Sequence, residues 1–162
     1  MKIALKILTI LFISYLAFSC QKNDASTNGV NYLRVMGGRY DRFSSGNMPD
    51  ANKSIVNGNT QLTITASSND EIPQVITLVI KNYTGATGTF TIVGVSGTAF
   101  AAYNRNPGAT DILSSNPESS PGTLVITGKD KISKGFVLYG TFSFTAGTYN
   151  FTSGKFQVFV GD

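Results

Sequence analysis

Residues 134–146 have the sequence KGFVLYGTFSFTA, in which an apolar residue stands at nearly every second position. Successive side chains of a β-strand point to opposite faces, so four large apolar residues share one face: Phe136, Leu138, Phe142 and Phe144. The other face is more polar, as in an antiparallel sheet with one side in the core and one toward solvent. We therefore expect a long strand here, with a bulge or bend at the interior Gly140.

The same alternation extends through residues 30–162, and no stretch shows a convincing helical period. Two further segments place apolar residues on one face: Leu62, Ile64 and Ala66 in TQLTITAS, and Phe156, Val158 and Val160 in KFQVFV. The segment QVITLVIK (74–81) is apolar on both faces, which is typical of a central or sandwiched strand.

Turn signals divide this pattern into strands. Hairpin-type signals occur at Gly37-Gly38, Asn57-Gly58 and Gly128-Lys129-Asp130. Further strands are expected near Tyr32–Met36, Arg39–Ser44, Gly88–Val93, Thr98–Tyr103 and Gly122–Thr127. Residues 30–162 are therefore predicted to form a single all-β domain, an antiparallel sandwich or barrel of roughly ten strands.

The first 19 residues have the features of a cleaved signal helix. Lys2 and Lys6 precede an apolar run from Ile7 to Phe18, which is shorter than the ~20 residues that a membrane-spanning helix needs. The run ends in LAFSC, which resembles the lipobox of bacterial lipoproteins, and Cys20 is the only cysteine. We expect Cys20 to be lipidated after cleavage, with residues 20–29 as a flexible tether; the alternative is an ordinary signal followed by a free thiol.

This N-terminus also predicts a location. A lipoprotein cysteine carries at least two acyl chains, which anchor a protein durably without spanning the membrane. Gln21 to Asp24 resemble the lysine-plus-acidic signals that send some Bacteroidota lipoproteins to the cell surface. We expect a lipid anchor in the outer membrane and leave surface exposure open.

The composition excludes several kinds of chemistry. The net charge of +4 includes Lys2 and Lys6, and removing their two charges leaves +2, without the concentrated basic face of a nucleic-acid binder. The chain has no histidine, which excludes Ser-His-Asp catalysis and His-based metal sites, and it has no tryptophan for stacking on sugars. We expect neither a cofactor nor a metal.

Carboxylates are the remaining groups for catalysis. A glycosidase needs two acids flanking the scissile bond. Asp70-Glu71 is the only adjacent acidic pair, and we interpret it as a solvated hairpin tip because acids are common in turns. The protein is therefore expected not to be an enzyme, with a carboxylate hydrolase of surface polysaccharide as the alternative.

The segment from Asn104 to Pro121 is a long loop with three prolines, in which only Ile112 and Leu113 could pack against the domain. Five residues in and next to it have the aromatic and hydrogen-bonding character of a glycan site: Tyr103, Asn104, Asn106, Asp111 and Asn116. The alternative is that these residues only build the loop.

A second candidate is the segment YLRVMGGRYDRF (32–43). It places Arg34, Arg39 and Arg42 among aromatic residues, an arrangement that can bind phosphates or anionic polymers. We favour the alternative, an amphipathic hairpin whose arginines cover its outer edge.

Three segments of the C-terminal half resemble a known family. They are GTLVIT (122–127) followed by Asp130, GTFSFTA (140–146) and GKFQV (154–158). In this order they resemble the closing strands of an uncharacterised family of small Bacteroidota lipoproteins, a domain of unknown function, over residues 74–160. The resemblance implies an all-β lipoprotein, and it brings no activity and no site residues.

The sequence thus favours a non-catalytic binding or structural module of the envelope, with a surface glycan or an envelope protein as partner. Besides the hydrolase, a barrel that binds a small apolar ligand remains open. In that case the phenylalanines would line a cavity rather than fill a core: Phe136, Phe142, Phe144 and Phe156.

Overall fold

The structure is a computed structural model that describes residues 31–94, 96–107, 112–114 and 121–162. The predicted signal peptide (1–19), the tether (20–29) with Cys20, and Val30 lie outside the described residues. Residues 31–162 form one unit with its own core. Its described part contains no helix, and accordingly none that could cross a membrane.

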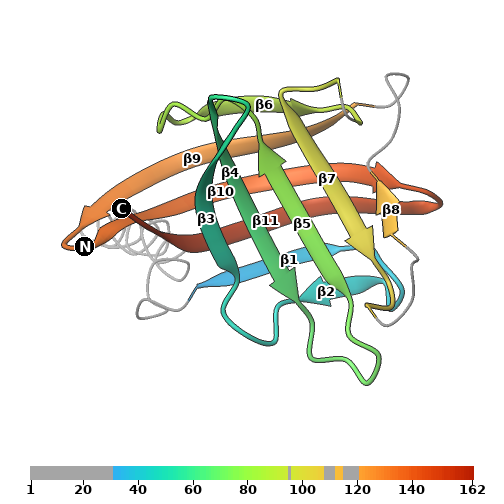
Figure 1. Cartoon of the computed structure of the whole chain (residues 1–162). Coiled ribbons are helices and arrows are strands. Elements are labelled where there is room, and N and C mark those ends of the chain that lie inside the picture. Colours follow the sequence, from blue (N-terminus) through green and yellow to red (C-terminus); the bar gives the residue numbers. More distant parts are fainter. Residues whose placement is uncertain (1–30, 95, 108–111, 115–120) are drawn as a thin grey trace, which may run out of the picture. The chain divides into compact units, whose positions relative to one another are not determined.

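The described residues form strands that all belong to one sheet (Figure 1). The strands are β1 (Tyr32–Met36), β2 (Arg42–Ser44), β3 (Asp50–Val56), β4 (Asn59–Ser67), β5 (Val75–Ile80), β6 (Gly88–Ile92), β7 (Ala99–Asn104), β8 (Ile112–Ser114), β9 (Gly122–Ile132), β10 (Gly135–Ala146) and β11 (Tyr149–Gly161). Their order is β2-β1-β11-β10-β9-β6-β7-β5-β4-β3, with β8 paired to β7. Among these pairs β6–β7 is parallel, at Ile92 and Ala99, and the others are antiparallel.

The sheet curls into a half-barrel, with β3, β4, β5 and β7 crossing over β1 and β9–β11 (Figure 1). Its two ends approach each other where β2 ends. Ser45 forms an isolated bridge with Ser68, and the Gly46 amide donates to the Ser67 carbonyl at 2.9 Å. The all-β prediction is confirmed. The described strands form one curled sheet rather than the two packed sheets of a sandwich.

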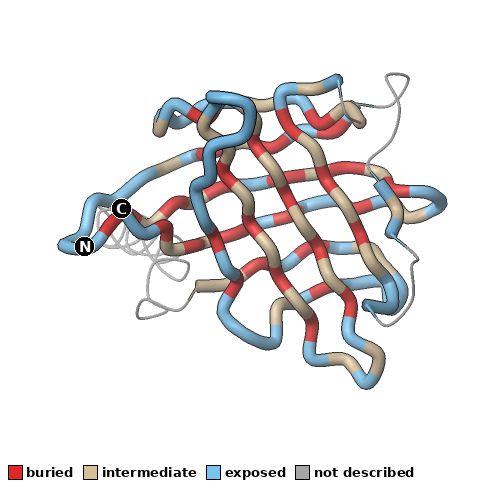
Figure 2. Tube along the Cα trace, viewed as in Figure 1, coloured by how far each residue is buried: buried red, intermediate tan, exposed pale blue. Residues whose placement is uncertain are grey.

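The core lies on the concave side, and buried residues alternate with half-buried or exposed ones along the strands (Figure 2). All the apolar faces predicted above point inward, including that of residues 136–144. Strand β5 is central, between β4 and β7, as predicted. Its outer face is half-buried rather than fully covered, because Val75, Thr77 and Val79 belong to the convex surface.

One turn prediction is confirmed in detail and one is wrong. Asn57 and Gly58 join β3 to β4 with φ of 51° and 79°, the paired positive angles of a tight hairpin turn. Residues 128–130 are not a turn, because β9 continues to Ile132. Two contacts stabilise this extension: Lys129 Nζ lies 4.2 Å from the centre of the Phe136 ring, and Tyr139 donates to Asp130 at 2.8 Å.

Gly140 lies at an irregularity, as predicted. The register between β10 and β9 shifts between Tyr139 and Gly140, and the extra residue belongs to β9. A Cβ at Gly140 would overlap the Phe156 ring and the Val125 carbonyl oxygen. The glycine is therefore required by close packing inside the sheet.

The other strand boundaries differ modestly from the expectation. β2 begins at Arg42 rather than Arg39, because Asp41 has a φ of 61° and interrupts the extended chain. The short strand β8 pairs with β7. Its Leu113 packs against the core, as expected, whereas Ile112, the other residue expected to dock the loop, is exposed.

Candidate functional site

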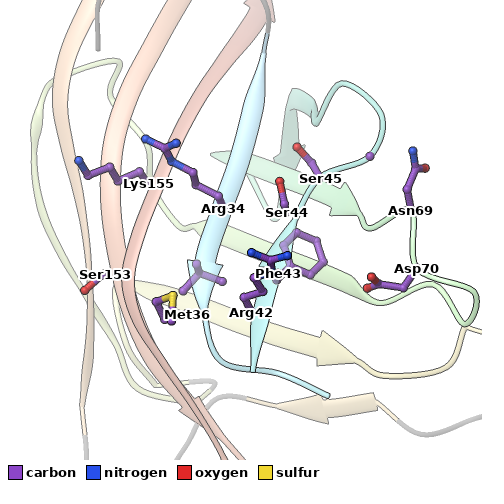
Figure 3. A pocket seen from close by; sticks show the side chains of 12 residues that line it. Arg34, Met36, Arg42, Phe43, Ser44, Ser45, Asn69, Asp70, Ser153 and Lys155 are labelled. Carbon is purple, nitrogen blue, oxygen red and sulfur yellow. The ribbon is translucent and has the colours of Figure 1, made fainter. Parts of the chain in front are cut away.

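A cleft of about 690 Å³ lies on the convex face of the sheet, where β11, β1 and β2 are neighbours (Figure 3). We call it the basic cleft. The side chains that matter for its chemistry come from these three strands and from the loop between β4 and β5: Arg34, Met36, Arg42, Ser44, Ser153, Lys155, Asn69 and Asp70.

Strand alternation places the cations on this surface. Arg34 stands between buried Leu33 and Val35, so its side chain points outward. Arg34 pairs directly with Lys155 of β11, and Figure 3 shows the two side chains next to one another. On the other side of β1, Arg42 of β2 pairs with Met36. Three positive charges thus lie on adjacent strands, which are ~4.8 Å apart.

Among the described residues, Asp70 is the only acidic one that lines the basic cleft. Its carboxylate accepts a hydrogen bond of 2.6 Å from Gln74 Nε2, which fixes its position within the loop. Neighbouring Glu71 is exposed and does not line the cleft. Among the described lining residues, three cations therefore outnumber one carboxylate, which gives this part of the cleft a net positive charge at neutral pH.

Ser153 reaches the cleft because β11 contains a β-bulge. Phe144 of β10 pairs with Phe151, and Phe142 pairs with Gly154, so β11 has one residue more than β10 over this interval. Ser153 has a φ of 57°, a conformation that is uncommon for residues other than glycine. Bulges of this kind re-aim side chains and are frequent near functional sites.

A buried polar network supports the cleft from inside. Gln74 is fully buried, and its Oε1 accepts from the Tyr103 hydroxyl at 2.6 Å and from the Arg39 amide at 3.0 Å. The same amide donates to the Tyr103 hydroxyl at 2.8 Å. Burial raises the pKa of Tyr103 above its ordinary value, since the charged phenolate is poorly solvated there. The network connects the β1–β2 turn to the loop that carries Asp70.

Sequence reasoning missed Gln74. The one available signal was a glutamine at the start of the apolar run QVITLVIK, where a buried amide needs partners.

None of the described residues that the sequence predicted to bind a glycan lines the basic cleft. Tyr103 is fully buried, with its ring edge-to-face against Tyr149 and Phe151, so it offers no exposed surface for stacking on a sugar. Asn104 Oδ1 accepts from the amide of exposed Asn106 at 2.9 Å, which is a local turn contact. Asp111 and Asn116 lie outside the described residues. The glycan role of this set stays a prediction.

The three arginines of residues 32–43 separate. Arg34 and Arg42 line the basic cleft, whereas Arg39 does not, and its guanidinium lies 5.7 Å from the centre of the Tyr40 ring. The aromatic residues pair with the arginines themselves, as Tyr32 does with Arg34 at 5.3 Å. Lys155 was not predicted, because it is distant in sequence and meets Arg34 only through the β1–β11 pairing.

The described residues contain no group of three or more His, Cys, Asp or Glu side chains that could hold a metal ion.

Neither the curated proteins nor the solved structures include a match to this chain. Residues 49–159 match a family model described as a domain of unknown function (DUF6252). The match runs from just before β3 into β11, and so includes Asp70, Ser153 and Lys155 but not Arg34 or Arg42. Because the matched segment is well over half of the chain, the protein belongs to the DUF6252 family.

Proposed function

We propose that the protein is a lipid-anchored, non-catalytic binding module of the bacterial outer membrane, and that the basic cleft binds an anionic ligand. The N-terminal sequence supports the anchor, since the apolar run ends at the chain's only cysteine. The resemblance to small Bacteroidota lipoproteins supports the same location.

One observation supports the binding role above all: Arg34, Arg42 and Lys155 lie on adjacent strands of one surface against a single carboxylate. A guanidinium forms paired hydrogen bonds with carboxylate, sulfate or phosphate groups, and a neighbouring ammonium adds a point charge. Such a surface is complementary to an anion.

The same geometry favours binding over hydrolysis. A hydrolase of the kind considered above needs two carboxyl groups about 5–10 Å apart in one cleft. The part of the chain that the structure describes contributes only Asp70 to the basic cleft, and the amide of Gln74 already occupies one of its oxygens.

An apolar ligand inside the curled sheet is also less well supported. Phe144 stacks on Phe151 with ring centres 4.5 Å apart, and Phe142 lies 6.4 Å from Phe156. These rings pack against each other, as the side chains of a filled core do.

The anchor is tested by the intact mass of the detergent-extracted protein, wild type beside Cys20→Ala. We expect the wild type to begin at Cys20 and to carry the added mass of acyl chains, and the variant to lack them. A wild-type protein that begins at another residue and carries no lipid would contradict the anchor. Ligand binding by the basic cleft would still be tested separately.

The ligand is tested with the full-length protein in nonionic detergent on an array of charged and neutral glycans. We expect binding only to glycans with carboxylate, sulfate or phosphate groups, and a loss of about tenfold in Arg34→Gln. The matched control is Arg39→Gln, which removes the same charge from the same hairpin outside the cleft. Equal losses in both variants would mean that overall charge, rather than the cleft, attracts the glycans.

A further inference from the structure

We propose, on the basis of this function, that the basic cleft is one end of a longer track that binds an acidic polysaccharide in an extended conformation. The class of ligand is a chain of sugars with carboxylate groups, such as a polyuronate. The track is the set of outward residues that cross β9, β10, β11, β1 and β2.

The evidence begins with a second pocket, of about 360 Å³, next to the basic cleft. It shares Ser153 and Lys155 with the cleft and adds three hydroxyl groups from β9 and β10: Thr123, Thr141 and Ser143. We call it the hydroxyl pocket. Two pockets with two common residues are neighbours on one surface.

Strand register shows that the track crosses the strands. One row runs through direct partners from Thr141 of β10 to Lys155 of β11, then to Arg34 of β1 and Ser44 of β2. From β9 to β2 there are four strand spacings, which correspond to about 19 Å. A single small anion cannot contact both ends of this surface.

A second row lies beside the first. Thr123 of β9 pairs with Ser143 of β10, and Met36 of β1 pairs with Arg42 of β2. Between them, the bulge of β11 places Ser153, which lines both pockets. The irregularity therefore occurs at the point where the two pockets meet.

The two ends differ in chemistry in a way that suits an acidic sugar chain. Hydroxyl groups of Ser and Thr both donate and accept hydrogen bonds, and so match the hydroxyl groups of sugars. The cations at the other end match carboxylates. Among the described residues, no exposed aromatic side chain lines either pocket, so recognition by the track rests on charge and hydrogen bonds rather than on ring stacking.

The test is calorimetric titration of the full-length protein, in nonionic detergent, with galacturonate, its linear hexamer and a hexaglutamate peptide. We expect the hexamer to bind at least about tenfold more tightly than the monomer, because linked sugars engage both pockets. We expect hexaglutamate to bind more weakly than the hexamer, because it lacks the sugar hydroxyls.

Two variants separate the ends of the track. Thr141→Val retains the β-branched shape but removes a hydroxyl group, and should weaken the hexamer about threefold while leaving the monomer unchanged. Thr127→Val is the control, since Thr127 is exposed on β9 and lines neither pocket. Arg34→Gln should weaken both ligands.

Each other outcome overturns the proposal in a recognisable way. Equal affinity for monomer and hexamer would retain anion binding by the basic cleft and refute the extended track. Equal affinity for hexaglutamate would assign the track to an acidic polypeptide. Absence of binding by all three probes would refute this inference, whereas the proposed function is refuted only if the sulfated and phosphorylated glycans of the array also fail to bind.

Discussion

Phe151 and Phe156 both lie in the core, although they stand five positions apart on the same strand, β11. In a regular strand, residues at an odd spacing point to opposite faces. The bulge between Phe151 and Gly154 removes this conflict, because it contributes one extra residue. The same bulge turns Ser153 outward, so the packing of the core and the shape of the candidate site depend on one irregularity.

Deletion of Ser153 should therefore leave the core intact, whereas deletion of Gln157 should not. Without Ser153, Phe151 and Phe156 are four positions apart and share one face of a regular strand, so both stay in the core. Without Gln157, the alternation shifts by one, so either Phe156 or Val158 must leave the core, and loss of a buried phenylalanine costs about 3–5 kcal/mol. The measurement is the free energy of unfolding in urea. Equal destabilisation by the two deletions would contradict this role of the bulge.

Gly140→Ala should also destabilise the fold. Its Cβ would overlap the Phe156 ring and the Val125 carbonyl oxygen, so the two strands must shift, at a cost of about 1–3 kcal/mol. Gly161→Ala is the control, since a Cβ there meets no atom within 4 Å. Both are measured by urea unfolding. Similar stability of the two variants would show that the sheet adjusts at Gly140 without cost.

Removing the hydroxyl of two buried tyrosines should have opposite effects. Tyr103→Phe takes a donor from Gln74 and an acceptor from the Arg39 amide, and should cost about 1–3 kcal/mol. The Tyr83 hydroxyl is buried and has no hydrogen-bond partner among the described residues, so Tyr83→Phe should be neutral or stabilising. Thermal unfolding of the two variants measures the difference. Equal destabilisation would contradict the importance of the Gln74 network.

The sequence was sufficient for the strands whose apolar residues alternate regularly. The segment 134–146 predicted its buried face correctly, since alternation is a local property and the hydrophobic effect acts on each side chain separately. No prediction was made for FTSG (151–154), because no local signal marks the bulge between Phe151 and Phe156. The sequence prediction failed at Gly128–Asp130, where contacts of Lys129 and Asp130 with β10 outweigh the local turn preference.

The candidate site was only half predictable, for a topological reason. Arg34 and Arg42 are close in the sequence and could be grouped, but Lys155 and Asp70 reach them through strand pairing and a loop from distant parts of the chain. Tyr103 was assigned to a ligand because it adjoins the long loop. In the structure its hydroxyl donates to a buried glutamine, a contact that no local pattern reveals.

The buried tyrosines also predict a loss of stability at high pH. Burial raises the pKa of Tyr83 and Tyr103 above 10.0, because desolvation disfavours the phenolate in the folded state. A raised folded-state pKa contributes stability that is fully present below the unfolded value near pH 10 and is lost as the pH rises through the folded-state pKa. In an alkaline titration, the tyrosinate absorbance of Tyr83 and Tyr103 should therefore appear only as the β-sheet circular dichroism signal is lost. In the double variant Tyr83→Phe/Tyr103→Phe, this unfolding-linked increase in absorbance should be absent. If all of the tyrosinate signal developed while the dichroism of the sheet was unchanged, the two phenols would be accessible to base in the folded protein, contrary to their burial.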